Sequence, residues 1–161
     1  MGKYNNIILD SDATFDTVQH EYGHHVMFKL LDNDFSIFLS CLGPHSFNQE
    51  INRFCAFTEG WADFVPALVQ GKSVSDDDNL ETNQNLAGED FAIEGSVARI
   101  FYDIYDYPTN DDDLMSNQSE KTWTILRDDN PSNILDFWDK WMQKGFDYEQ
   151  YKNELYDIYN K

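Results

Sequence analysis

Hydrophobic residues recur at helical spacing along most of this chain, and the pattern predicts a mostly helical fold. The first such stretch follows a capping residue at Ser11 or Asp12, and its buried face would contain Phe15, Val18, Tyr22, Val26 and Leu30. Residues 50–69 predict a second helix, with Pro66 near its end. Residues 91–107 predict a third helix with a buried face of Ile93, Val97, Ile100, Phe101, Ile104 and Tyr105.

Shorter elements complete this prediction. Three further helices are expected over 120–127, 134–142 and 148–159. The segment 4–10 is typical of a short strand, and 35–43 is apolar but ambiguous between helix and strand. Residues 71–88 are polar, contain no aromatic residue and predict a long surface loop. We expect one domain over 1–161, in the α+β class but predominantly helical.

Composition and charge exclude some classes of partner. The chain has 161 residues, 41% of them hydrophobic, which is globular composition, and its net charge is −19. Such a charge repels nucleic acid and anionic membranes, so neither is an expected partner. No apolar run is long enough to span a membrane, and the N-terminus lacks the apolar segment of a signal peptide. We favour an extracellular or cell-surface location over the cytoplasm and leave the oligomeric state open.

The two cysteines give a weaker signal. Cys41 and Cys55 lie in the same region and could form a bridge in an oxidising compartment. Cys55 stands between Phe54 and Ala56, where a small buried hydrophobe is the usual occupant. The sequence therefore favours two buried thiols over a disulfide.

The motif HEYGH provides the strongest chemical signal. His20 and His24 are four residues apart on a predicted helix, so they project from one face about one turn apart and can bind one cation. Glu21 follows the first histidine and can reach the attacking water without binding the metal, which is the geometry of a general base. The alternative is a polar patch of histidines that binds nothing.

A third metal ligand is expected in the stretch FTEGWADF. A catalytic zinc ion takes three protein ligands and keeps one position open. Glu59 can supply the third ligand, and Asp63, one turn further on the same helix, can accept a hydrogen bond from a zinc-bound histidine. Taken alone, these two residues would favour an ordinary solvated acidic face, and it is the HEYGH motif that favours the site. Glu94 is an alternative third ligand.

Together, HEYGH and the downstream EGWAD resemble the gluzincin metallopeptidases, the thermolysin-like group. The resemblance implies a zincin-like core, zinc ligands His20, His24 and Glu59, the general base Glu21, and an Asp63 that supports His20. Members of that group usually carry several strands before the HExxH helix, whereas here only one short strand precedes it. A trimmed catalytic domain or a reduced form similar to the minigluzincins is therefore expected.

Two related groups do not match. No G-x-M-E-N segment precedes the motif, so the aminopeptidase branch is not supported. The metzincin continuation is absent, because Met27 stands at the required glycine and Leu30 at the third histidine.

Weaker candidates surround this site. A peptidase needs a donor that stabilises the tetrahedral oxyanion, and His45, Arg99, Tyr102 and Tyr105 could serve. His25 would point away from the ligand face and is expected to pack structurally. Calcium is considered at the aspartate runs 10–12, 76–78 and 111–113, although none has the spacing of an EF-hand.

The sequence thus predicts a zinc-dependent metallopeptidase, an endopeptidase that acts on peptide or protein substrates. Two alternatives stay open. One is a non-catalytic or latent zinc-binding protein that acts through protein interaction, and the other is an acidic helical interaction module whose histidines bind no metal.

Overall fold

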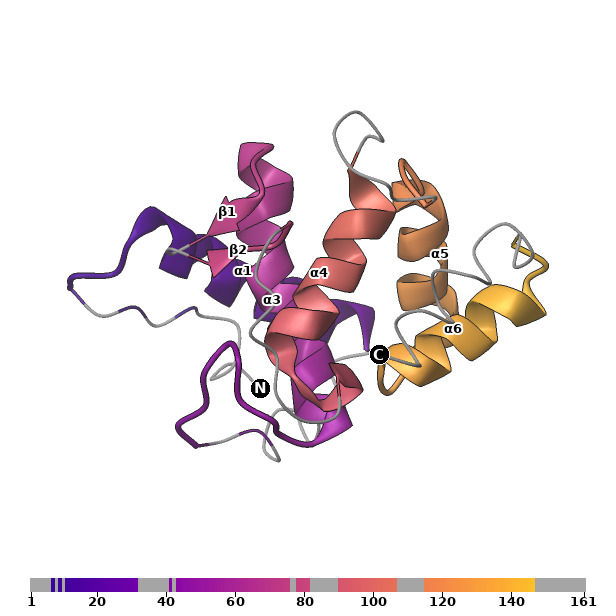
Figure 1. Ribbon diagram of the computed structural model, residues 1–161, viewed down its shortest axis with the longest axis horizontal. Helices are drawn as coiled ribbons and strands as arrows, with labels where there is room; N and C mark the ends of the chain where they lie inside the picture. The colour runs from indigo at the N-terminus through magenta and orange to yellow at the C-terminus, as the bar shows by residue number, and fades with distance from the viewer. Residues whose placement is uncertain are drawn as a thin grey trace.

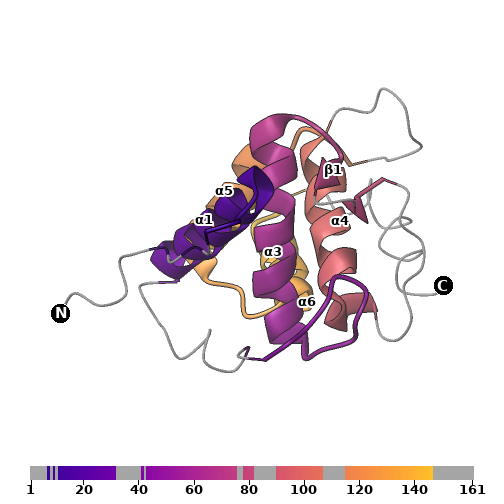
Figure 2. The same ribbon diagram turned by 90° about the vertical axis from the view of Figure 1, so that its left-hand side faces the viewer.

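The central element of the fold is α3 (Arg53–Gln70), which packs against α1 (Phe15–Leu30) on one side and α4 (Glu94–Tyr105) on the other (Figure 1). The computed structural model describes residues 7, 9, 11–31, 41, 43–75, 78–81, 90–106 and 115–146. Helices α5 (Ser119–Asp129) and α6 (Ile134–Gln143) pack together beyond α4 in Figure 1, and they lie behind α1 and α3 in the view of Figure 2. The predominantly helical class is confirmed.

The sheet component differs from the prediction. In the described residues, the only paired strands are β1 (Val74–Ser75) and β2 (Asp78–Asn79), a short antiparallel pair. They lie inside the segment 71–88 that was predicted to be a loop, so that prediction is wrong for these residues. The predicted strand 4–10 lies largely outside the described residues. The described part of the chain is therefore not a zincin core, and that part of the fold prediction is not confirmed.

Helix α1 buries the predicted face only in part, since Val26 and Leu30 are half-buried and pack against the core. Its buried residues are Gln19, Gly23 and Met27, whereas Phe15 and Tyr22 are 71% and 52% exposed. A Cβ atom on Gly23 would lie 2.9 Å from the Cα atom of Ala62, so the missing side chain lets α1 approach α3 closely. This approach places Gly23 at the centre of the buried face and leaves only part of the most hydrophobic stripe in contact with the core. The helix also starts later than expected, because its N-cap is Thr14 and not Ser11 or Asp12.

Helix α3 begins at Arg53 because the side chain of Asn52 accepts a hydrogen bond from the backbone N–H of Cys55. The two residues predicted to lie in its first turn are extended instead. Glu50 forms a bridge with Ile93, and the N–H of Ile51 donates to Ala92 O at 2.7 Å. The helix continues through Pro66 and ends at Gly71, which adopts a left-handed conformation with φ 63°.

The remaining helices follow their predictions closely. Helix α4 starts at Glu94, because residues 90–92 form a 3-10 turn, and its predicted apolar face is buried apart from the half-buried Tyr105. Asn133 caps α6 through two backbone N–H groups. The core joins α1, α3, α4, α5 and α6, and its largest fully buried side chains are Trp61, Trp141, Phe57, Phe101 and Phe137.

Three predictions fall outside the described residues, wholly or in large part. These are the ambiguous segment 35–43, the helix 148–159 and the aspartate runs considered for calcium. Among the helices that are described, none is both long and apolar enough to cross a membrane.

The prediction of two thiols is wrong, because Cys41 and Cys55 form a disulfide with a Cα–Cα distance of 5.3 Å. The chain between them folds back onto the start of α3 and brings the two Cα atoms within bridging range. Sequence spacing alone does not show this return of the chain.

Replacing both cysteines with alanine is expected to lower the free energy of unfolding by about 3 kcal/mol, since the bridge closes a loop of moderate length in the unfolded chain. Urea unfolding of the variant and of the wild type measures the difference. Reducing the wild type provides the matched comparison and should lower its midpoint similarly. Identical midpoints for oxidised and reduced wild type would contradict the bridge.

Candidate metal centre

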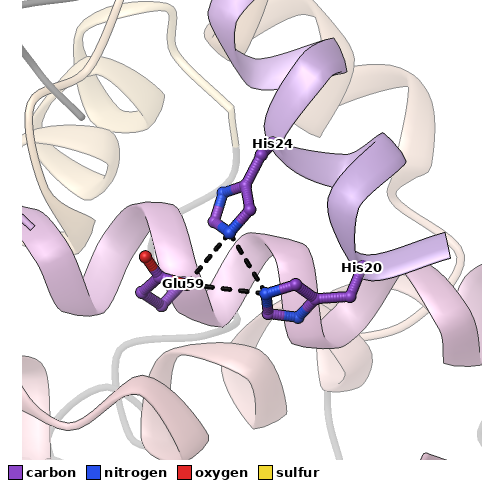
Figure 3. A group of neighbouring side chains, drawn as sticks. All are labelled: His20, His24 and Glu59. Atoms are coloured by element: carbon purple, nitrogen blue, oxygen red, sulfur yellow. Dashed lines mark hydrogen bonds and ion pairs between the residues drawn. The ribbon is translucent and has the colours of Figure 1, made fainter. Parts of the chain in front are cut away.

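The HEYGH motif and the EGWAD motif meet where α1 crosses α3. The close contact at Gly23 brings the two helices together, and the indole N–H of Trp61 donates to the carbonyl of Gly23 at 3.1 Å. This buried bond fixes Gly23 of HEYGH against Trp61 of EGWAD. His20 and His24 therefore point from α1 toward Glu59 on α3 (Figure 3).

Three ligand atoms converge at this crossing. His20 Nε2 and His24 Nε2 lie 3.1 Å apart, and Glu59 Oε2 lies 3.6 Å from the first and 3.0 Å from the second. Tetrahedral zinc with bonds of about 2.0–2.1 Å separates its ligand atoms by about 3.3–3.4 Å. The three side chains thus have both the chemistry and the spacing of a zinc site, with Glu59 only 6% exposed.

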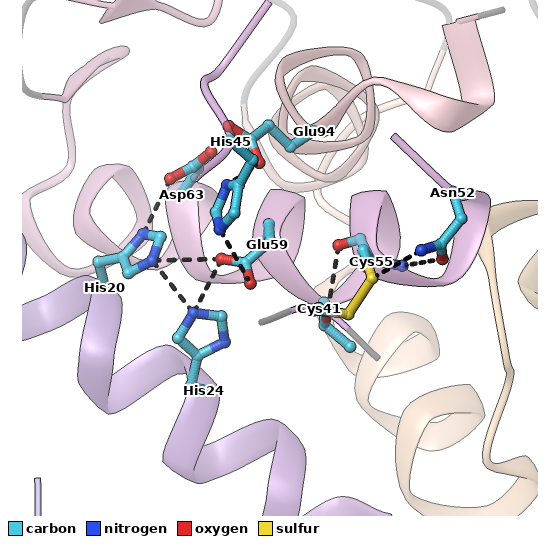
Figure 4. A network of polar contacts seen from close by, with 10 residues as sticks. His20, His24, Cys41, His45, Asn52, Cys55, Glu59, Asp63 and Glu94 are labelled. Carbon is cyan, nitrogen blue, oxygen red and sulfur yellow. Dashed lines mark hydrogen bonds and ion pairs between the residues drawn. A yellow bond between two sulfur atoms is a disulfide. The ribbon is translucent and has the colours of Figure 1, made fainter. Parts of the chain in front are cut away.

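Asp63 contacts His20 at Nδ1, the ring nitrogen that does not face Glu59 (Figure 4). Its Oδ1 atom is 2.8 Å from His20 Nδ1. This contact favours the tautomer that carries its proton on Nδ1, which directs the lone pair of Nε2 toward the convergence point. The structure therefore places Asp63 where the sequence predicted a supporting carboxylate.

The carboxylates around the site shift the pKa of His20, and the histidines shift the pKa of Glu59. Burial disfavours the charged imidazole of His20, but hydrogen bonds to Asp63 and Glu59 outweigh it and raise its pKa to about 10. Burial would raise the pKa of Glu59, yet hydrogen bonds from the two histidines hold it well below its usual range. A divalent cation at the three ligand atoms would replace the proton on His20 and balance this charge.

Glu21, the predicted general base, is half-buried on α1 beside His20. The described residues form no hydrogen bond or ion pair with it. Its carboxylate is therefore available to a substrate or a water molecule.

A histidine paired with a carboxylate adjoins the site, and the sequence did not indicate this pairing. His45 Nδ1 lies 2.9 Å from Glu94 Oε2, and His45 Nε2 lies 3.7 Å from Glu59 Oε1 (Figure 4). Burial and the charge of Asp63 raise the pKa of Glu94 to about 7, although His45 lowers it. Glu94, considered as an alternative ligand, instead pairs with His45. The one feature of the sequence that could have indicated a role for Glu94 is its place in the first turn of a helix with an apolar face.

The other predicted residues lie elsewhere. Arg99 Nε donates to Leu80 O at 2.9 Å. Tyr105 packs edge to face against Phe64, and Tyr102 is buried beside it. His25 stacks on Tyr22 with ring centroids 6.4 Å apart, in agreement with a packing role.

Comparison with known families shows the protein family of the chain. Residues 2–155 match the family model described as the Mycolysin C-terminal domain. The chain belongs to this family. No curated protein and no solved structure matches the chain.

Membership of the Mycolysin C-terminal domain family connects the chain with peptidases, because the domain is found in thermolysin-family peptidases. It thereby supports a loose link to the gluzincins that HEYGH and EGWAD resemble.

Proposed function

We propose that this chain hydrolyses peptide bonds with one zinc ion held by His20, His24 and Glu59. The observation that carries the proposal is the convergence of three ligand atoms within 3.6 Å of one another, contributed by two helices that cross at Gly23. Two histidines and one carboxylate are a known ligand set of catalytic zinc, and they leave one position open.

The residues around the ligands have distinct roles in this proposal. Zinc, when bound, polarises the scissile carbonyl and makes water a stronger acid. Glu21 accepts the proton of the attacking water and delivers it to the leaving amine. Asp63 holds His20 through Nδ1, so that this ring keeps its orientation during the reaction. The oxyanion donor stays a prediction among His45, Arg99, Tyr102 and Tyr105.

The proposed substrates are peptides or proteins cut internally, outside the cell or at its surface. The disulfide Cys41–Cys55 supports this location, because such bonds persist in oxidising compartments. Mycolysin-type domains also come from secreted peptidases.

The test is cleavage of a mixed quenched-peptide library by the zinc-loaded protein. We expect one zinc per chain, hydrolysis that stops after chelation, and recovery when zinc is returned. His24→Ala is expected to lose both zinc and hydrolysis, because a catalytic zinc ion takes three protein ligands and only two would remain. Hydrolysis that is indifferent to chelation would contradict the proposal.

The second candidate function is a latent or non-catalytic zinc-binding protein. It is favoured by the absence of a multi-stranded sheet from the described residues, since peptidases commonly hold extended substrates along a sheet edge. One retained zinc without cleavage of any library peptide would support it. Failure to retain zinc would instead favour an interaction module.

A further inference from the structure

Two carboxylate–histidine pairs flank the carboxylate of Glu59. On one side, Asp63 holds His20 through Nδ1 at 2.8 Å, and His20 Nε2 faces Glu59 Oε2. On the other side, Glu94 holds His45 through Nδ1 at 2.9 Å, and His45 Nε2 faces Glu59 Oε1. The two oxygens of Glu59 are thus directed at different histidine groups (Figure 4).

His45 is not part of the convergence of His20, His24 and Glu59. Its ligand atoms group only with those of Glu59 and Glu94 among the described residues. Its Nδ1 lies at hydrogen-bond distance from Glu94 Oε2, 2.9 Å, and its Nε2 faces Glu59 Oε1 at the ion-pair distance of 3.7 Å. This geometry favours a role on Glu59 over the substrate-binding role considered from the sequence.

The segment that carries His45 is fastened to both neighbouring helices. The disulfide of Cys41 ties it to Cys55 on α3, one turn before Glu59. The carbonyl of Phe47 accepts the N–H of Gly95, the residue after Glu94, at 2.9 Å. The ring of Phe47 occupies the space that a side chain at Gly95 would need, because a Cβ there would lie 2.5 Å from it.

The end of the segment is held as well. Glu50 bridges to Ile93, immediately before Glu94, and Asn52 caps α3. The chain therefore fixes His45 relative to Glu59 on α3 and to Glu94 on α4 at the same time. Such support is typical of a side chain whose exact position matters.

We infer that His45 and Glu94 are positioning residues that hold Glu59 Oε1, so that Glu59 presents only Oε2 to the metal. This inference rests on the proposed zinc site. A carboxylate that is free to rotate can offer both oxygens and fill the open position that a catalytic site needs. The His45–Glu94 pair keeps that position open.

The variants His45→Gln and His45→Asn test the inference. A glutamine amide can reach the place of Nε2 beside Glu59, whereas the shorter asparagine reaches only that of Nδ1. His45→Asn is expected to keep one metal ion per chain but to lower kcat about 10- to 100-fold, with a smaller change in KM. His45→Gln is expected to recover part of this loss.

Cobalt substitution provides a readout that needs no substrate. Visible absorption of the Co²⁺ protein weakens when the coordination number rises above four. We expect weaker absorption in His45→Asn and in Glu94→Gln, which retains the volume of the side chain but removes its charge. His25→Ala, at the remaining histidine on α1, is the matched control and should give the wild-type spectrum.

The outcomes separate this inference from the proposed function. Unchanged spectra and kcat in both His45→Asn and Glu94→Gln would overturn the inference and leave the zinc peptidase intact. Altered spectra in a protein that cleaves no peptide would support the inference while the proposed function fails. A wild type that binds neither zinc nor cobalt would overturn both.

Discussion

Glu21→Gln is expected to lower the rate of peptide hydrolysis by about 10²–10⁴-fold, the usual contribution of a positioned general base. Glutamine has nearly the same helix propensity and volume, and Glu21 is not a proposed ligand, so the fold and the zinc content should stay unchanged. The measurement is kcat/KM for a peptide selected from the library, together with the zinc content of each preparation.

The control for Glu21→Gln is His25→Ala, which changes a polar residue on the same helix away from the convergence point. It should retain both activity and zinc. A Glu21→Gln protein with full activity would remove Glu21 from the mechanism and with it the proposed reaction. Loss of zinc in that variant would assign Glu21 a structural role instead.

The parts of the site that lie within one helix could be predicted from the sequence. His20 and His24 share a face because four residues make about one helical turn, and their Nε2 atoms lie 3.1 Å apart. Glu59 and Asp63 share a face of α3 for the same reason. The apolar periodicity of α4 also identified its buried face, because that helix packs through its most hydrophobic stripe.

The parts that depend on contact between distant segments could not be predicted. His45 and Glu94 are 49 positions apart, and no local pattern links a loop histidine to the first turn of a later helix. The disulfide depends in the same way on the return of the chain to α3. The face of α1 was predicted only in part, because the small residue Gly23 lets the two helices cross closely and leaves the larger Phe15 and Tyr22 exposed.

Gly60→Ala is expected to destabilise the protein by about 1–3 kcal/mol or more, although alanine is favoured over glycine inside a helix by about 1 kcal/mol. A Cβ at this position would lie 2.6 Å from the carbonyl oxygen of Glu94 and 2.9 Å from the backbone nitrogen of Ala98. Backbone atoms cannot rotate away, so α3 and α4 would have to separate. Urea unfolding measures the loss of stability.

The same separation should reach the metal centre, because the backbone oxygen that would be displaced belongs to the residue that holds His45. We expect a Gly60→Ala protein that still folds to show the weaker Co²⁺ absorption of Glu94→Gln. Gly145→Ala is the control, since nothing lies within 4 Å of its Cβ and only its φ of 70° opposes the change, at about 1 kcal/mol. If Gly60→Ala were as stable as the wild type, α3 and α4 would not pack at this distance, and the support that α4 gives to His45 and Glu59 would fail with it.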